Sequence, residues 1–176
     1  MHVNKLLVFL ETYDLYKFCD ILILGECHKL YSCNNHNIPG FNTYYDNASF
    51  NKFDGLIIYT KQNLNPEINS SVLSESNIKI TKMNVEINFL KYDILALYRS
   101  PSSNLNCFLE DLNEYLVNQP NDKDVSLLIG DLNLNLLNDN DNNVNEYVSI
   151  MAAFGFQPKY REVTRGKSGT CLEKGK

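Results

Sequence analysis

The chain has 176 residues, 44% of them hydrophobic and 11% aromatic, which is the composition of one folded domain and not of a disordered chain. Its formal net charge of −5 argues against a protein that binds nucleic acid through a global positive field, but argues less against a metal-dependent nuclease. An odd number of cysteines, no signal peptide and no apolar run near the ~20 residues of a bilayer span predict an intracellular protein, nuclear or cytoplasmic, with no membrane partner.

Apolar periodicity predicts the elements of the first half of the chain. Apolar residues at helical spacing indicate a helix, and short continuous apolar runs indicate buried strands. Clusters of Asn, Pro and Gly indicate loops between them. In chain order we expect a helix over 6–18, a buried strand over 21–24, a loop over 34–40, a short strand over 43–45, a buried strand over 56–59 and a polar, turn-rich segment over 62–76.

The second half mixes alternating strands with amphipathic helices. Alternation of apolar and polar residues favours antiparallel strands with one exposed face. Together the elements predict an α/β sandwich with mixed sheets. In order we expect strands over 78–81 and 85–89, a turn over 91–93, a strand over 94–98, a helix over 105–116 capped by Ser103, a buried strand over 125–129, a polar segment over 138–143, a helix over 144–154 closed by Gly155, and a basic, turn-rich tail over 159–176.

Polar side chains follow the buried strand over 125–129. Gly130 interrupts the apolar run where a Cβ would crowd a close approach of the backbone. Asp131, Asn133 and Asn135 then alternate with two leucines, so in an extended chain the polar groups would share one side. The same residues could instead form a turn, since Asp and Asn also close turns through their own backbone. Both interpretations stay open at this point.

Further polar residues at the predicted ends of strands suit phosphodiester hydrolysis. Glu26 could hold a hard cation such as Mg²⁺, which prefers oxygen ligands. Asp131 could orient or deprotonate the attacking water, and Asn133 could hold that water or a phosphate oxygen. Tyr98 and Arg99 could bond the negative charge that builds up on phosphorus. The late residues Thr164, Arg165 and Thr170 complete this set.

The order of these motifs resembles the endonuclease/exonuclease/phosphatase superfamily, and within it the abasic-site-type endonuclease domains of non-LTR retrotransposons. The matching stretches are Asp-Ile-Leu-Ile-Leu-Gly-Glu over 20–26, Leu-Tyr-Arg-Ser-Pro over 97–101, Leu-Ile-Gly-Asp-Leu-Asn over 128–133, and Thr164-Arg165 followed by Ser-Gly-Thr-Cys-Leu over 168–172.

The resemblance implies a deoxyribonuclease I-like fold, a four-layer α/β sandwich of mixed sheets, in a single domain over 1–176. It also implies DNA nicking with Mg²⁺, or with Mn²⁺ as the alternative, beside a reverse transcriptase domain of the parent element. By this likeness Glu26 is the metal ligand, Asp131, Asn133 and Tyr98 are catalytic, and the substrate contacts are Arg99, Asn135, Thr164, Arg165 and Thr170.

Two departures from the family pattern lower the expected activity. The family opens with a strand that carries an asparagine, whereas this chain begins in its first predicted helix. The family closes with an Asp-His pair, whereas here Glu173 and Lys174 follow the last motif. The sequence therefore predicts a copy that lacks the first and last strands and nicks DNA weakly or not at all. The alternatives are an inactive module that binds nucleic acid or protein, and a phosphatase of the same fold.

Single residues also have simpler interpretations. Glu26 could be a solvated strand-end carboxylate, Tyr98 a core tyrosine, and Arg99 part of a turn. The basic tail could follow a DNA backbone or be a solvated terminus. A zinc site remains a minor alternative, formed by Cys27, His28, Cys33 and His36.

Overall fold

The structure of the chain is a computed structural model, and it describes residues 12, 17–25, 37–47, 55–73, 76, 78–120, 123–160 and 171–174. The chain divides into two compact units, Met1–Pro66 and Glu67–Lys176, and each is described by itself. The predicted first helix lies largely outside the described residues, and a single domain that is incomplete at both ends stays a prediction. In the described segments, no helix has the length and apolar character that crossing a membrane requires.

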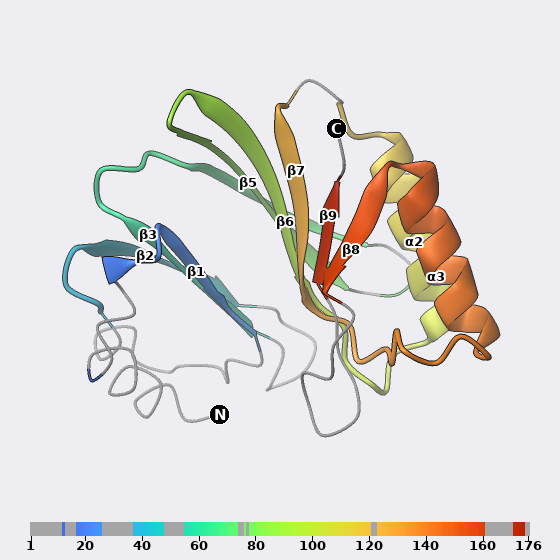
Figure 1. The fold of residues 1–176 in the computed structure, drawn as a ribbon. Coiled ribbons are helices and arrows are strands. Elements are labelled where there is room, and N and C mark those ends of the chain that lie inside the picture. Colours follow the sequence, from blue (N-terminus) through green and yellow to red (C-terminus); the bar gives the residue numbers. More distant parts are fainter. Residues whose placement is uncertain are drawn as a thin grey trace. The chain divides into compact units, whose positions relative to one another are not determined.

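The first unit contains a three-stranded antiparallel sheet in the order β1-β3-β2 (Figure 1). Its strands are β1 (Ile21–Leu24), β2 (Phe41–Asn47) and β3 (Gly55–Lys61). The central strand β3 is buried along almost its whole length, as its apolar run predicts. Strand β1 was also predicted to be buried, but its residues are only half-buried because it lies at an edge of the sheet.

The second unit contains a six-stranded mixed sheet in the order β4-β5-β6-β7-β9-β8. Strands β6 and β7 are parallel, and every other neighbouring pair is antiparallel. The mixed sheet predicted from the sequence is therefore confirmed. The strands are β4 (Glu67–Val72), β5 (Lys79–Ile87), β6 (Leu90–Tyr98), β7 (Val125–Asp131), β8 (Phe156–Tyr160) and β9 (Cys171–Lys174).

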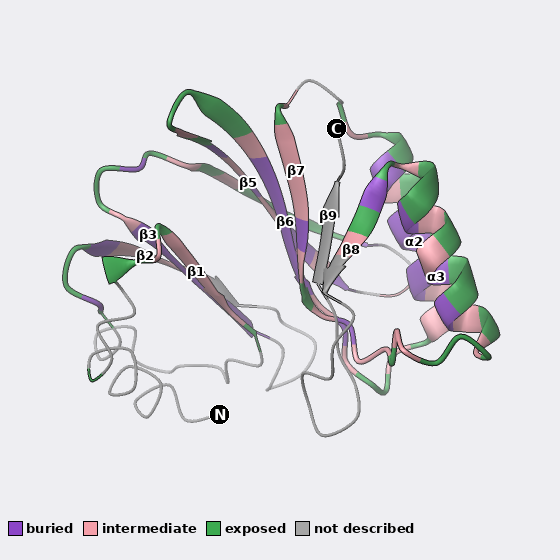
Figure 2. Cartoon of the chain, viewed as in Figure 1, coloured by how far each residue is buried: buried purple, intermediate pink, exposed green. Residues whose placement is uncertain are grey.

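Two amphipathic helices, α2 (Leu105–Val117) and α3 (Asn142–Ala153), lie on one side of this sheet (Figure 1). The buried residues of both helices lie on the side nearer the sheet (Figure 2). Helix α2 connects β6 to β7, because a parallel pair of strands needs a long crossover. The core between the helices and the sheet includes Leu95, Leu97, Phe108, Leu109, Leu112, Leu128, Tyr147 and Met151.

The start of α2 differs from the sequence-based expectation. Asn104 caps the helix, and its side-chain oxygen accepts hydrogen bonds from the backbone N–H groups of Asn106 and Cys107. The hydroxyl of Ser103, the predicted cap, instead donates to Ser100 O at 2.8 Å. Both residue types cap helices well, so the sequence did not distinguish them. Ser103 is therefore not the helix cap, and its carbonyl and hydroxyl oxygens contact the guanidinium of Arg99 near the candidate site.

Several strand boundaries also differ from the prediction. Strand β4 occupies part of the segment predicted as turns, because it is an exposed edge strand that pairs with β5 and shows no apolar alternation. The strands predicted over 78–81 and 85–89 are one strand, β5. The turn predicted over 91–93 is part of β6. Residues 171–174, predicted as turn-rich, form β9 between β7 and β8.

The hairpin between β5 and β6 turns through Asn88 and Phe89, which have φ angles of 51° and 66°. Left-handed conformation at both positions is that of a type I′ turn, for which Asn-Gly is the preferred pair. Phe89 is 92% exposed and makes little packing contact. We expect Phe89→Gly to raise the free energy of unfolding by about 0.5–1 kcal/mol, measured by urea denaturation.

The matched control for this prediction is Phe89→Ala, which removes the ring but keeps a Cβ in the left-handed region. If alanine stabilised the chain as much as glycine does, relief of backbone strain would not be the cause.

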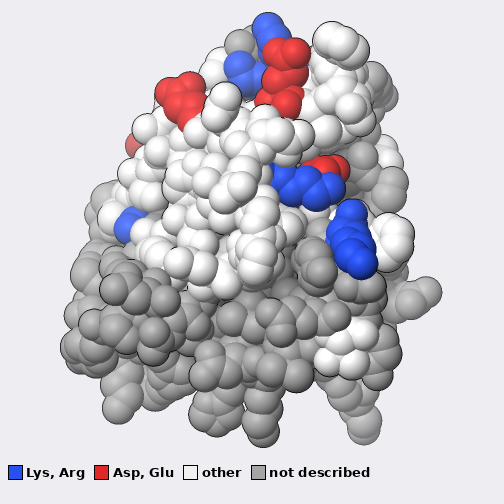
Figure 3. Space-filling view, turned by 90° about the vertical axis from the view of Figure 1, so that its left-hand side faces the viewer, with Lys and Arg blue, Asp and Glu red and all other residues white. Residues whose placement is uncertain are grey.

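Charged side chains are scattered on the face drawn in Figure 3. Positive and negative groups lie side by side there, and the described Lys and Arg residues on this face form no continuous basic band. This distribution agrees with the net charge of −5. Contacts between DNA and the described residues of this face would therefore depend on local groups rather than on a broad positive field.

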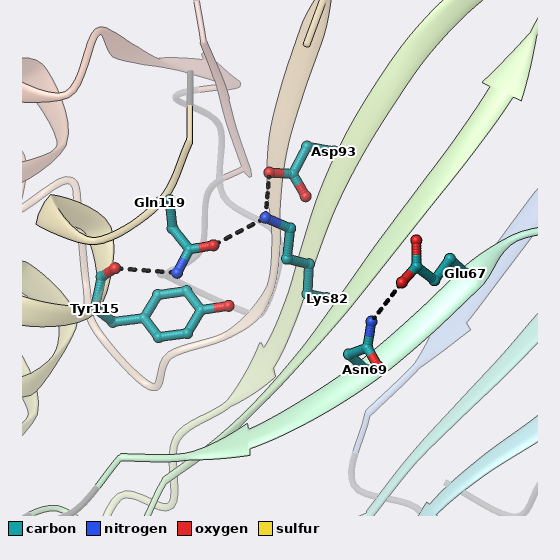
Figure 4. A network of polar contacts seen from close by, with 6 residues as sticks. All are labelled: Glu67, Asn69, Lys82, Asp93, Tyr115 and Gln119. Atoms are coloured by element: carbon teal, nitrogen blue, oxygen red, sulfur yellow. Dashed lines mark hydrogen bonds and ion pairs between the residues drawn. The ribbon is translucent and has the colours of Figure 1, made fainter. Parts of the chain in front are cut away.

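A partly buried polar network joins the end of α2 to the sheet (Figure 4). Lys82 Nζ lies 3.2 Å from Asp93 Oδ2 and donates to Gln119 Oε1 at 2.8 Å. Gln119 Nε2 in turn donates to Tyr115 O at 3.2 Å. Burial, and then the negative charge of Asp93, raises the pKa of Tyr115 to about 12. Tyr115 therefore stays protonated at neutral pH. The network connects the end of α2 to β5 through Lys82 and to β6 through Asp93.

Candidate functional site

The parallel strands β6 and β7 bring two of the predicted catalytic residues together. Tyr98 and Asp131 are register partners at the ends of these strands. The strand ends stay aligned beyond this pair, because Arg99 N donates to Asp131 O at 2.9 Å. Partners on neighbouring strands lie about 5 Å apart and project their side chains to the same face. The side chains of Tyr98 and Asp131 therefore start from adjacent positions on one face of the sheet, at the carboxyl ends of β6 and β7.

Gly130 allows the two strands to approach each other this closely. A Cβ at this position would lie 1.7 Å from Leu97 O, its neighbour on β6. Real Cβ atoms do not approach a carbonyl oxygen so closely, and the colliding atom belongs to rigid backbone. The sequence-based interpretation of Gly130 as a point of close backbone approach is confirmed.

The residues after β7 form a turn. Asn133 has a φ of 49°, a left-handed conformation that asparagine tolerates better than most residues do. Its backbone N–H donates to Asp131 Oδ1 at 3.0 Å, which closes the turn through the carboxylate of Asp131. The alternative of an extended chain with three polar groups on one side is therefore wrong, whereas the turn interpretation is confirmed.

The side chain of Asn133 points back to β6. Its Nδ2 donates to Arg99 O at 2.8 Å. This bond uses the amide nitrogen and leaves the amide oxygen as an acceptor. Leu132, between Asp131 and Asn133, is buried and anchors the turn to the core that α2 and α3 cover. The turn is thus held at its middle by packing and at its end by a hydrogen bond.

Arg99 has main-chain partners. Its side chain is buried, Nε donates to Leu132 O at 2.6 Å, and Nη2 donates to Asn133 O at 3.1 Å. Nη1 lies 3.2 Å from both the carbonyl oxygen and the hydroxyl of Ser103. Burial lowers the pKa of Arg99 below its ordinary value, and the negative charge of Asp131 opposes that shift. All three nitrogens of the guanidinium are thus engaged inside the protein.

Asn135, the other predicted substrate contact in the described part of the chain, is exposed. Its Oδ1 accepts a hydrogen bond from Leu137 N at 3.3 Å and so closes a local turn. A contact between Asn135 and substrate stays a prediction.

No protein-family model matches this sequence, and no curated protein matches it either. Solved structures do match it. An endonuclease/exonuclease/phosphatase family protein from Bacteroides thetaiotaomicron gives a TM-score of 0.68 at 13% identity, over 98% of this chain and 73% of that one. The endonuclease domain of TRAS1, a telomere-specific non-LTR retrotransposon, gives 0.61 at 11% identity, over 93% and 76%. A humanized TDP2 from D. rerio gives 0.65 at 16% identity, over 89% and 62%.

The chain has the fold of the endonuclease/exonuclease/phosphatase family. The resemblance read from the motifs is therefore confirmed for the fold, and so is the predicted fold class, α/β with mixed sheets of the deoxyribonuclease I type. The chain spans 62% of the length of the TDP2 protein.

The described residues offer few ligands for a metal ion at the candidate site. Among the residues that the structure describes, no group of three or more His, Cys, Asp or Glu side chains could hold an ion. Asp131 and the amide oxygen of Asn133 still fit the chemistry of Mg²⁺, which takes one or two carboxylates and completes its shell with water and phosphate. The predicted ligand Glu26 lies outside the described residues.

The remaining predicted site residues also fall outside the described part of the chain, so their roles stay predictions. These residues are Thr164, Arg165 and Thr170, together with Cys27, His28, Cys33 and His36 of the alternative zinc site.

Ser103 lies next to the candidate site, although the sequence predicted it only as the cap of a helix. Its carbonyl and hydroxyl both meet the guanidinium of Arg99, four residues earlier in the chain. The sequence signal for this contact was a serine four residues after an arginine. It was outweighed by the position of Ser103 just before a helix, where serine is a common cap.

Proposed function

We propose that the chain is a Mg²⁺-dependent endonuclease of the non-LTR retrotransposon type, which hydrolyses phosphodiester bonds in DNA at a low rate. The observation that carries the proposal is the pairing of Tyr98 with Asp131 at the ends of β6 and β7, with Asn133 turned back beside them. The fold shared with the endonuclease domain of TRAS1 supports it.

Each of these side chains has a role that its chemistry allows. The carboxylate of Asp131 orients the attacking water and accepts its proton as the bond between the water oxygen and phosphorus forms. The bond from phosphorus to one sugar oxygen breaks in the same displacement, and the leaving oxygen takes up a proton from solvent water. The hydroxyl of Tyr98 donates to a phosphate oxygen, where negative charge increases in the transition state. The amide oxygen of Asn133 accepts a hydrogen bond from the same water. The hydrogen bond from Asn133 N to Asp131 Oδ1 fixes Asp131 and Asn133 relative to each other.

Glu26 is the residue that we propose to hold Mg²⁺, or Mn²⁺ in its place. The bound ion would neutralise charge on the phosphate during the displacement. Arg165, Thr164 and Thr170 would lie on the substrate side. The partner is DNA, and the parent element would carry a reverse transcriptase that extends the nicked strand.

The test is nicking of supercoiled plasmid by the 176-residue chain with Mg²⁺, compared with the same reaction in EDTA. We expect slow, Mg²⁺-dependent conversion to the open circular form. A folded, monodisperse protein that leaves the plasmid supercoiled would contradict the proposal. In that case, salt-dependent DNA binding without cleavage would indicate the inactive binding module. Release of phosphate from small phosphorylated molecules would indicate the phosphatase.

A further inference from the structure

The guanidinium of Arg99 connects two separate segments near the candidate site. It donates to the main chain of the turn after β7, at Leu132 O and Asn133 O, and to both oxygens of Ser103 ahead of α2. Only arginine offers several N–H donors in a fixed plane that can meet acceptors on different sides at once. A lysine ammonium could meet one of these segments without holding the other.

The contact between Arg99 and Asn133 is reciprocal. The side chain of Arg99 donates to Asn133 O, and the side chain of Asn133 donates to Arg99 O. Asn133 is thereby held in its left-handed conformation, in which its N–H meets Asp131 Oδ1. The orientation of the Asp131 carboxylate therefore depends on bonds that Arg99 makes to its neighbours, Leu132 and Asn133.

A buried cation needs compensation for its lost hydration. Arg99 is 4% exposed, and it is compensated by carbonyl oxygens and by the charge of Asp131 beside it. A guanidinium held in this way has little freedom to turn toward a phosphate. The burial and the occupied donors favour a role inside the protein over a substrate contact.

We infer that Arg99 is a positioning residue, which with Ser103 holds the Asp131–Asn133 turn in the geometry needed for hydrolysis. The inference rests on the proposed function, because positioning acts through the reaction at Asp131. It assigns to Arg99 a role different from the contact with phosphorus charge that the sequence suggested.

The test compares Arg99→Lys and Arg99→Met with the wild-type chain. Both variants are expected to lower kcat about 10- to 100-fold with little change in KM, since a misplaced catalytic group loses rate and not substrate affinity. Ser103→Ala removes one of the two oxygens that Nη1 meets and is expected to lower kcat less. Lys91→Met is the matched control, because it removes a positive charge from an exposed site at the other end of β6.

A second readout separates positioning from phosphate contact without relying on catalysis. The dependence of DNA affinity on salt falls by about one unit of log–log slope when a protein loses one phosphate contact. We expect Arg99→Lys and Arg99→Met to keep the wild-type slope. A smaller slope in Arg99→Met, together with a raised KM, would overturn the inference.

Hydrogen exchange at Asn133 N–H distinguishes a failed inference from a failed function. This N–H donates to Asp131 Oδ1, so it should exchange faster in Arg99→Lys if Arg99 holds the turn. Unchanged exchange would overturn the inference whether or not the wild-type chain cuts DNA. Faster exchange in a chain that does not nick plasmid would leave the positioning role standing and contradict the endonuclease. Arg99→Lys is the milder of the two variants and serves if Arg99→Met does not fold.

Discussion

Asp131→Asn is expected to lower the rate of plasmid nicking by about 10²- to 10⁴-fold, the usual contribution of an acid–base group. Asparagine keeps an oxygen that can accept the hydrogen bond from Asn133 N–H, so the turn after β7 should persist. It removes the negative charge and the basic oxygen that would take the proton of the water. The measurement is the initial rate of nicking under saturating Mg²⁺ and plasmid, with urea denaturation as a check on folding.

Asp131→Ala separates chemistry from structure at the same position. Alanine removes the carboxylate and also the acceptor for Asn133 N–H, so we expect the same loss of rate with an added loss of stability of about 1 kcal/mol. An Asp131→Asn variant with wild-type activity would show that this carboxylate takes no part in the reaction. Equal stability of the two variants would show that the bond to Asn133 contributes nothing to the fold.

Gly130→Ala is the second change with a large expected effect. The added Cβ would meet Leu97 O at 1.7 Å and Leu97 C at 2.8 Å, so the ends of β6 and β7 must separate. We expect a loss of about 3 kcal/mol in the free energy of unfolding, at the upper end for overpacked sites because the colliding atoms are backbone. For a chain of this size this corresponds to a fall of roughly 10 °C in Tm, measured by calorimetry.

The same substitution should also lower activity. Gly130 directly precedes Asp131, whose register partner across the strands is Tyr98, so separation of the strands moves the two apart. Ser126→Ala, on the same strand, adds no atom and should leave both stability and rate close to wild type. A Gly130→Ala protein as stable as Ser126→Ala would mean that the two strands can part locally without cost.

Several elements could be predicted from the sequence because side-chain periodicity is a local property. The apolar run of β3 and the stripes of α2 and α3 appear in the structure close to the predicted bounds. Strand β4 was missed because it is polar and lies at an edge, where pairing with β5 takes the place of apolar burial. The prediction used only the pattern within each segment, and that pattern carries no information about pairing with another segment such as β5.

The sequence by itself determined that Tyr98 is the last residue of an apolar strand, that Asp131 comes just after another, and that Gly130 permits a close approach of the backbone. Only the tertiary structure decided that Tyr98 and Asp131 are register partners and that the chain turns at Asn133. It also decided two partners of Arg99, Leu132 and Asn133, which lie 33 and 34 residues away in the chain. The physical reason is that a buried polar group bonds to whichever atoms the fold brings near it, and no spacing within one segment records those atoms.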